Sequence, residues 1–186
     1  MVGLTFVVLC FSASAMAQVP YVRAVDQLPA MAFYQLDGQA FWRLSNHVLT
    51  AEGGATPDPR PVYVQFGSVS CEPCHALAAW INERLPDAVL RVYAHIDEVE
   101  LAENAMPLGR LRRDLQAQMS ADEDYSTFLP LVAVPLSLVQ ALTGSDSLPG
   151  GLLILPDGRH VSFSGFDTAQ AERVVAWFEQ EWSTYE

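Results

Sequence analysis

Cys71 and Cys74 lie in the stretch SCEPCHAL, separated by two residues. Two thiols at this spacing can form and break a disulfide with each other, which is redox chemistry. Extended by His75 to C-x-x-C-H, the same letters also match a covalent attachment site for a c-type haem. The motif alone does not separate these two chemistries, so the elements that position it must decide.

The residues around the cysteines predict a strand followed by a helix. Val62 to Phe66 form a short apolar run that is typical of a buried strand. Cys71 then opens a helix, where free N–H groups and the helix dipole stabilise a thiolate, so Cys71 is the expected nucleophile. Cys74, one turn further on, is expected to be buried and to attack a mixed disulfide formed at Cys71. The apolar stripe of this helix is Leu77, Trp80, Ile81 and Leu85.

The rest of the chain predicts a mixed sheet with helices on both faces. Early strands that alternate with helices pair in parallel, whereas a hairpin at the end pairs antiparallel. The expected elements besides the strand and helix above are a hairpin in 28–44 around Asp37-Gly38, a short helix in 45–51, a strand in 88–97, a helix in 101–119, a loop leading into a buried helix in 128–142, a hairpin in 151–166 around Asp157-Gly158, and a last helix from Asp167 to Glu181 with Asp167 and Gln170 as a capping box.

The first residues predict a secretory signal peptide over 1–17. Val2 to Phe11 form a short apolar segment, and Ala15 to Ala17 is an A-x-A cleavage site, although no Lys or Arg precedes them. Cleavage after Ala17 removes Cys10 and leaves the two cysteines of the motif. Their loop is too small to restrict the unfolded chain much, so the pair is expected to be chemical rather than structural. The mature chain would be one domain, 18–186, in the periplasm or outside the cell.

Composition sets limits on the partners. The chain has 186 residues, of which 51% are hydrophobic and 17% charged, as in a compact globular protein. Its formal net charge of −12 repels phosphate backbones, so nucleic-acid binding is not expected.

The sequence resembles the exported thioredoxin-like proteins of the TlpA/ResA type. The resemblance rests on LPAMAFYQLDGQAFWRLS, RPVYVQFGSVSCEPC, HID and LPGGLLILPDG, the last with Pro149 nine residues before Gly158. It implies an α/β thioredoxin fold with an extra N-terminal β-hairpin. It also implies a monomeric thiol–disulfide oxidoreductase without cofactor or metal, which acts on protein thiols and disulfides of the cell envelope and is recharged by a membrane thiol donor.

The resemblance also assigns a substrate-binding surface. Pro149 would follow a cis peptide bond and lie across from Cys71, and Leu148 would offer main-chain groups to an extended substrate. Pro73, between the cysteines, completes this surface and removes an N–H that the first helical turn does not use.

Three features depart from the family. Ser70 stands where Trp is usual before the first cysteine. Gln65 stands where cytoplasmic thioredoxins have a buried Asp; because an amide cannot accept a proton from Cys74, a water or another carboxylate would have to do so. Gly150 and Gly151 follow Pro149 where Thr is common, which predicts a more flexible loop.

Glu72 and Gln65 are the residues expected to tune the pKa of the two thiols. The Glu72 carboxylate opposes the helix dipole, and no Lys or Arg stands near the motif in the sequence. A less stabilised thiolate predicts a reductant with a potential of roughly −220 mV or below, rather than the roughly −120 mV of a strong oxidase. His75 is expected to be a helix-surface residue without a role.

Two alternatives stay open at this stage. One is a non-catalytic binding module that keeps the fold, suggested by Ser70 and the two glycines. The other is a c-type haem protein with His75 as axial ligand, which an apolar strand and a C-terminal hairpin do not favour. A structural zinc would need more ligands than two cysteines and scattered histidines.

Overall fold

The computed structural model describes residues 22–23, 31–35, 41–45, 48–51, 60–68, 70–96, 108–132 and 136–185. The signal peptide, the Asp37-Gly38 turn and the whole of 101–107, which was expected to begin a helix, lie outside these residues. The elements are β1 (Val22–Arg23), β2 (Met31–Gln35), β3 (Phe41–Ser45), β4 (Val48–Ala51), β5 (Val62–Gly67), α1 (Glu72–Arg84), β6 (Leu90–His95), α3 (Leu108–Ala121), η2 (Glu123–Tyr125), β7 (Leu129–Val132), α4 (Leu136–Thr143), β8 (Gly150–Ile154), β9 (His160–Ser164) and α5 (Thr168–Trp182).

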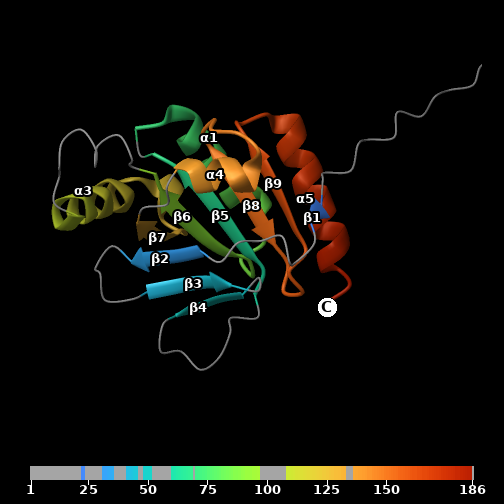
Figure 1. Ribbon diagram of the computed structural model, residues 1–186. Coiled ribbons are helices and arrows are strands. Elements are labelled where there is room, and N and C mark those ends of the chain that lie inside the picture. The colour runs from blue at the N-terminus through green and yellow to red at the C-terminus, as the bar shows by residue number, and fades with distance from the viewer. Residues whose placement is uncertain are drawn as a thin grey trace, which may run out of the picture.

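A single mixed sheet organises these elements (Figure 1). Within the described residues its strand order is β1-β9-β8-β5-β6-β7-β2-β3-β4. The central strand β5 runs parallel to β6 and antiparallel to β8, and β6 runs parallel to β7. The predicted α/β class with a mixed sheet is confirmed.

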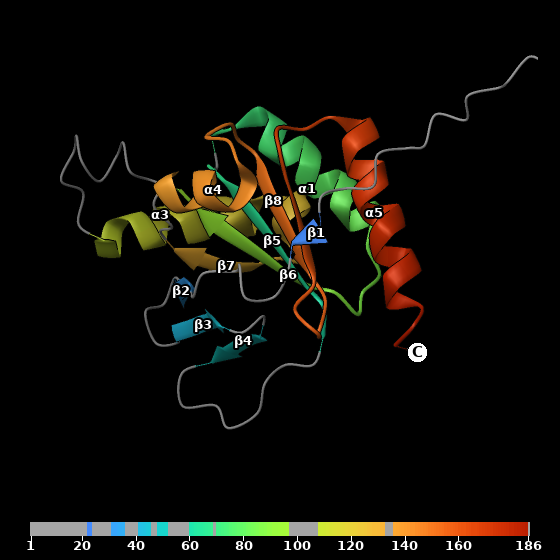
Figure 2. The same ribbon diagram turned by 45° about the vertical axis from the view of Figure 1, so that its right-hand side comes forward.

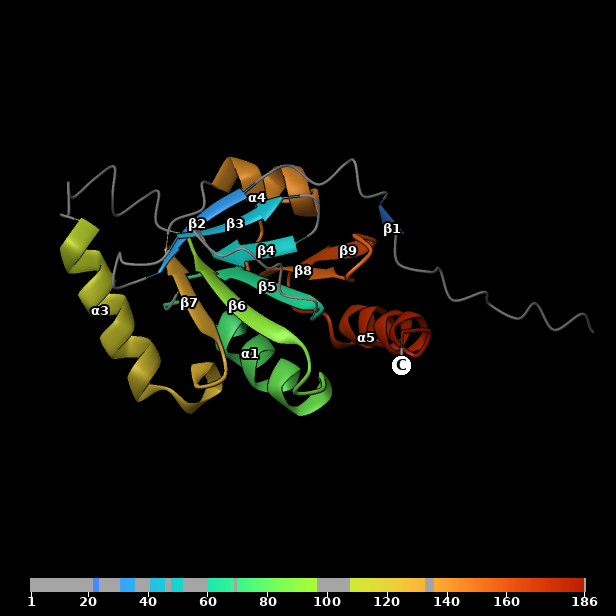
Figure 3. The same ribbon diagram turned by 90° about the horizontal axis from the view of Figure 1, so that it is seen from below.

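The strands bury alternate residues against two separate cores, as the period of two requires. Figure 3 shows α4 on one side of the sheet and α1 and α5 on the other. The core under α4 contains Val64, Phe66, Val92, Val139 and Leu142. The larger core under α1, α3 and α5 contains Tyr63, Leu77, Tyr93, Leu115, Tyr125, Phe163 and Phe178. Helices therefore cover both faces, as predicted.

The N-terminal hairpin is present, with an additional strand beside it. β2 and β3 pair antiparallel from Met31 opposite Leu44 to Tyr34 opposite Phe41. The predicted short helix in 45–51 is wrong, because Val48–Ala51 is β4 and pairs with β3. The hairpin joins the main sheet through β2, which pairs with β7.

β7 itself was missed by the sequence reading. The apolar run 128–142 was expected to be a loop leading into a helix, and α4 is that helix, but Leu129–Val132 is a strand. β7 pairs with β6 along its whole length, including Pro130 opposite Tyr93, whereas its ladder with β2 covers only Leu131 and Val132. Among the described residues Pro130 has a strand partner on the β6 side only, which a residue without an N–H tolerates.

The two glycines after Pro149 are not a flexible loop, and that expectation is wrong. Gly150 and Gly151 are buried residues of β8, paired with β5 on one side and β9 on the other. Gly151 lies opposite Phe163, and a Cβ built on it would overlap the Phe163 ring. The glycine is needed because an aromatic ring packs directly on the strand backbone.

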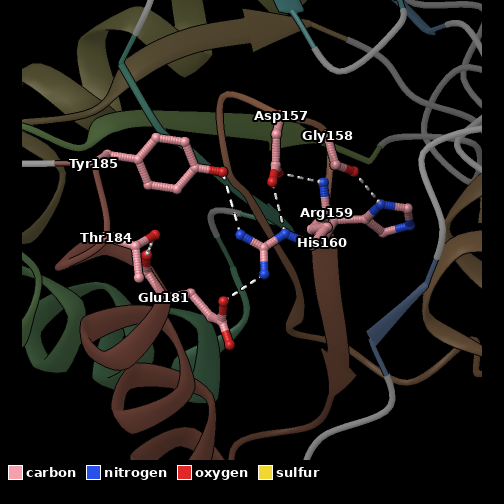
Figure 4. A network of polar contacts seen from close by, with 7 residues as sticks. All are labelled: Asp157, Gly158, Arg159, His160, Glu181, Thr184 and Tyr185. Atoms are coloured by element: carbon pink, nitrogen blue, oxygen red, sulfur yellow. Dashed lines mark hydrogen bonds and ion pairs between the residues drawn. The ribbon is translucent and has the colours of Figure 1, made fainter.

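The last helix is fixed to the sheet at both ends. Asp167 caps it by accepting a hydrogen bond from the Ala169 N–H at 2.9 Å, so the predicted N-cap is confirmed. At the other end Arg159, in the β8–β9 turn, reaches Asp157 with its Nε at 2.6 Å and also contacts Glu181 and the Tyr185 hydroxyl (Figure 4).

Helices α1 and α5 lie side by side on the larger core (Figure 2). Arg84 Nη2 of α1 is 2.6 Å from Glu172 Oε1 of α5, and its guanidinium lies 5.6 Å from the ring centroid of Trp80. The buried stripe of α5 comprises Ala171, Val174, Val175, Trp177 and Phe178. This packing holds α1, whose N-terminus carries the cysteines, at a fixed place on the sheet.

Candidate active site

The two cysteines lie where β5 passes into α1. The backbone turns after Gly67, with the Cys71 N–H donating to the Ser68 carbonyl at 3.0 Å. Cys71 is the N-cap residue of α1 and is half-buried, whereas Cys74 is fully buried. The two are joined by a disulfide with their Cα atoms 5.2 Å apart. Cys71 is thus partly exposed to solvent, whereas Cys74 is not.

The first turn of α1 contains the other residues of the motif. Pro73 occupies one of the first two helical positions, where the chain can do without its N–H. The Cys74 N–H donates to the Cys71 carbonyl at 2.9 Å and tightens the turn. Glu72 and Pro73 are exposed, so both lie on the surface that a partner would meet.

Gln65 lies below the motif and is completely buried in β5. Its Nε2 donates to the Cys74 carbonyl at 2.8 Å, and its Oε1 accepts from the Tyr63 hydroxyl at 3.4 Å. The amide therefore anchors the backbone of Cys74 rather than its sulfur. A carboxylate at this position would have no N–H to give to that carbonyl.

Gly67 and Tyr93 border the buried sulfur, and the sequence reading identified neither. A Cβ built on Gly67 would lie 2.9 Å from Cys74 Sγ and 2.9 Å from Tyr93 Oη. The glycine thus lets the end of β5 approach the disulfide closely. Tyr93 comes from β6, where it pairs with Gln65, and burial holds the pKa of its hydroxyl far above the usual range.

The expected substrate-binding residues stand at the same end of the sheet. The Leu148–Pro149 peptide bond is cis, as the resemblance implied. Gly150, the next residue, pairs with Phe66 of β5, directly before Gly67 and the turn to Cys71. Pro149 is buried and its carbonyl accepts from the Gly165 N–H at 2.8 Å, whereas Leu148 is half-buried.

The side chain of His75 makes specific contacts, whereas the sequence predicted a helix-surface residue without a role. Its Nδ1 is 2.7 Å from Asp122 Oδ2, and both side chains are about two-thirds buried or more, with 32% and 25% exposed. Its ring also lies edge-on to Tyr125, with centroids 5.0 Å apart. Asp122 is the N-cap of η2, a segment that no sequence pattern predicted.

A pocket of about 430 Å³ opens beside His75, and its walls are His75, Gln118, Ala121, Asp122, Glu123 and Tyr125. His75, Asp122 and Asp124 each offer a possible ligand atom, all within 4.8 Å of one another. Protein groups already engage the Asp122 carboxylate at both oxygens, because Oδ2 contacts His75 and Oδ1 accepts from the Asp124 N–H at 2.9 Å. We therefore assign these residues to a hydrogen-bonded pair and not to a metal centre.

Comparison with known proteins gives structural matches alone. No family model matches the chain. No curated protein matches it in sequence. The exposed lipoprotein thioredoxin Etrx1 of Streptococcus pneumoniae superposes with a TM-score of 0.52 at 17% identity, covering 82% of this chain and 99% of that one. A thiol:disulfide interchange protein DsbE of Chlorobium tepidum, assigned provisionally, gives 0.51 at 18%, covering 80% and 93%.

A thioredoxin-like protein of Aeropyrum pernix gives a TM-score of 0.53 at 11% identity, over 79% of this chain and 88% of that one. These superpositions decide the architecture. The chain has the thioredoxin fold. In this thioredoxin-fold protein the dithiol sits at the N-terminus of the first helix after the central strand, as the sequence predicted. None of the described helices is both long and apolar enough to pass through a bilayer.

Proposed function

We propose that this protein is an exported thiol–disulfide oxidoreductase that uses Cys71 as nucleophile and Cys74 as resolving thiol. The observation that carries the proposal is the contrast between the two bonded sulfurs: Cys71 is half-buried at a helix N-terminus and Cys74 is fully buried one turn later. A substrate can reach only the first of them.

The reaction balances without any further reagent. In the reduced protein the Cys71 thiolate attacks a substrate disulfide, whose S–S bond breaks as the first substrate sulfur leaves as a thiolate and takes up a proton. Cys74 then loses its proton and attacks Cys71 Sγ, which expels the second substrate sulfur. The substrate has gained two electrons and two protons, and the protein is left with the Cys71–Cys74 disulfide seen here.

Turnover on a disulfide substrate tests this proposal. The protein should accelerate reduction of insulin disulfides by dithiothreitol, and Cys71→Ser should abolish the acceleration. A rate no better than dithiothreitol alone would contradict the proposal and favour a binding module. That alternative has lost one of its two motives, since Gly150 and Gly151 belong to a buried strand, and only the exposed Ser70 remains.

The haem alternative is not supported by the geometry. Attachment of a c-type haem needs both cysteine sulfurs to reach one porphyrin. Here the two sulfurs are bonded to each other, Cys74 is fully buried, and Nδ1 of the adjacent His75 contacts Asp122.

We infer that the protein works as a reductant. Among the described residues, acidic groups lie close to the motif: Glu72 in the first turn of α1, and Asp122, which contacts His75. Their negative charge disfavours a thiolate at Cys71 and so favours the disulfide form. Equilibration against glutathione and dithiothreitol buffers should give a potential of roughly −220 mV or below, whereas a value near −120 mV would contradict the reductant proposal.

The proposed setting is the cell envelope. Support comes from the apolar segment and the A-x-A site in 1–17, which would place the mature protein, beginning at Gln18, in the periplasm or outside the cell. Its substrates there would be protein disulfides that bind at Pro73, Leu148 and Pro149. A membrane thiol donor would reduce the protein again after each turnover, and the protein would act as a monomer. N-terminal sequencing of exported protein should start at Gln18; retention of residues 1–17 in the cytoplasm would contradict export.

A further inference from the structure

The resolving step requires that Cys74 lose its proton, and the buried acid that usually accepts this proton is missing. Cys74 must lose its proton before it attacks the mixed disulfide, but the group beneath it is the Gln65 amide, which donates to the Cys74 carbonyl and accepts no proton. Cys74 is fully buried, so its proton also has no direct route to solvent. Another set of groups must lead from this sulfur to the surface.

The nearest such group is the Tyr93 hydroxyl. A Cβ built on Gly67 would lie 2.9 Å from the Tyr93 hydroxyl oxygen and 2.9 Å from Cys74 Sγ, so both atoms border this position. The hydroxyl is buried and has no hydrogen-bond partner in the described part of the chain. A disulfide sulfur cannot donate to it, but the Cys74 thiol of the reduced protein can.

Tyr125 continues the path away from the sheet. Its ring is tilted against that of Tyr93 with centroids 4.7 Å apart, and its buried hydroxyl likewise lacks a partner among the described residues. Burial raises the pKa of Tyr125 to about 12. Burial, together with the neighbouring Tyr125, raises the pKa of Tyr93 further still. Both hydroxyls therefore stay neutral, so each can pass a proton on by accepting one and giving up its own, but neither can keep the charge.

The path ends at the His75–Asp122 pair on the pocket wall. The Tyr125 ring packs edge-on against His75, 5.0 Å between centroids, and His75 Nδ1 is held by Asp122 at 2.7 Å. Among the described residues, Asp122 and Asp124 offer carboxylate oxygens within 4.8 Å of this imidazole, and Glu123 lines the same pocket. α3 contributes the uncharged Gln118 and Ala121 to the wall of the pocket.

We propose that the His75–Asp122 pair takes the proton of Cys74 through the hydroxyls of Tyr93 and Tyr125, in place of a buried acid at position 65. The Cys74 proton moves to Tyr93, the Tyr93 proton to Tyr125, and the Tyr125 proton to the imidazole, which releases it into the pocket. The freed Cys74 sulfur attacks Cys71 Sγ, and the substrate sulfur leaves with the electron pair. Tyr93 borders the reacting sulfur, and Tyr125, His75 and Asp122 act through it.

This inference rests on the proposed function and deepens it. The test separates the two sulfur exchanges by mixing reduced protein with oxidised glutathione and following both, first formation and then resolution of the mixed disulfide, from about pH 5 to pH 9. Tyr125→Phe and His75→Gln should slow resolution by about a hundredfold near neutral pH and leave the first exchange unchanged. The loss should persist across this pH range, because Cys74 is fully buried and hydroxide has no direct route to its proton.

Controls distinguish relay from structure. Tyr63→Phe removes another buried tyrosine hydroxyl in the same core, one that contacts Gln65, and should leave the rate of resolution within about twofold. Asp122→Asn can still cap η2 through its side-chain oxygen, and it should slow resolution while leaving the first exchange unchanged. Variants that resolve as fast as the wild type at every pH, or that slow both exchanges equally, would overturn the relay. If the wild type formed no mixed disulfide at all, the proposed function would fail instead.

Discussion

Single residues at the end of β5 set what the dithiol can do. Gly67 has no side chain, so Cys74 Sγ and the Tyr93 hydroxyl can both lie close to the strand backbone at this position. Gln65 holds the Cys74 backbone without offering a base. The sequence alone identified Gln65 as a departure from cytoplasmic thioredoxins, because its position is found by counting back along the chain from the two cysteines. It could not identify Gly67 or Tyr93, since their role depends on contacts between neighbouring strands.

Gly151 provides a residue-scale prediction about packing. Gly151→Ala should lower the free energy of unfolding by about 1–3 kcal/mol, because the new methyl group overlaps the Phe163 ring. Urea denaturation measures the loss. The adjacent Gly150→Ala is the matched control: its nearest neighbours would lie at 3.2 Å and 3.3 Å, and the reduced chain entropy of roughly 0.5–1 kcal/mol offsets the tight fit. Equal losses at the two positions would show that the ring does not set the requirement.

At the scale of elements, local patterns predicted those strands and helices that bury a continuous face. β5, α1, β6, α5 and the Asp157-Gly158 hairpin were predicted correctly, and each shows its own apolar period or turn signal. β7 was missed because its pairing depends on a distant segment: it lies between β6 and the N-terminal β2. β4 pairs with the neighbouring β3 and was missed because its four residues are too few to show a clear period. η2, which supplies Asp122 and Tyr125 to the site, is too short for any periodicity to reveal.

The attachment of α5 to the β8–β9 turn yields a second prediction. Arg159→Ala should lower the free energy of unfolding by about 1 kcal/mol, because it removes contacts to Asp157, Glu181 and Tyr185 that are partly exposed. The control is Arg173→Ala, which removes an exposed arginine of α5. It should change the free energy of unfolding by no more than a few tenths of a kcal/mol. A loss as large in the control would mean that general charge, and not this network, holds the helix.

The same network makes a prediction about acid. Partial burial on its own raises the pKa of Asp157, but hydrogen bonds from Tyr185 and Arg159 outweigh it, so the pKa lies below its ordinary value of 3.8. A carboxyl group with a depressed folded-state pKa stabilises the fold above its unfolded pKa, and this contribution is lost as the pH falls through the folded value. The wild type should therefore exceed Asp157→Asn in stability at neutral pH, and the difference should fade from about pH 5 to about pH 2. A constant difference across this range would contradict the account.

On the scale of the whole molecule, the fold brings three separate regions to one end of the sheet. The β5–α1 junction contributes the dithiol, the cis-proline segment before β8 contributes the proposed substrate surface, and η2 contributes the polar pair beside the pocket. The sequence placed the first two by their resemblance to known exported proteins. It could not place the third, because nothing in the chain near 122–125 points to residue 75.

The central claim is that Cys71 receives the substrate and Cys74 releases it, and trapping of mixed disulfides tests it most directly. Reduced Cys74→Ser and Cys71→Ser proteins are incubated with a disulfide-bonded protein, quenched with acid and run on non-reducing gels. Cys74→Ser should accumulate a mixed disulfide through Cys71, because the resolving sulfur is gone. Cys71→Ser should trap almost nothing, because its remaining thiol is buried. Trapping by Cys71→Ser but not by Cys74→Ser would reverse the two roles and contradict this account of the site.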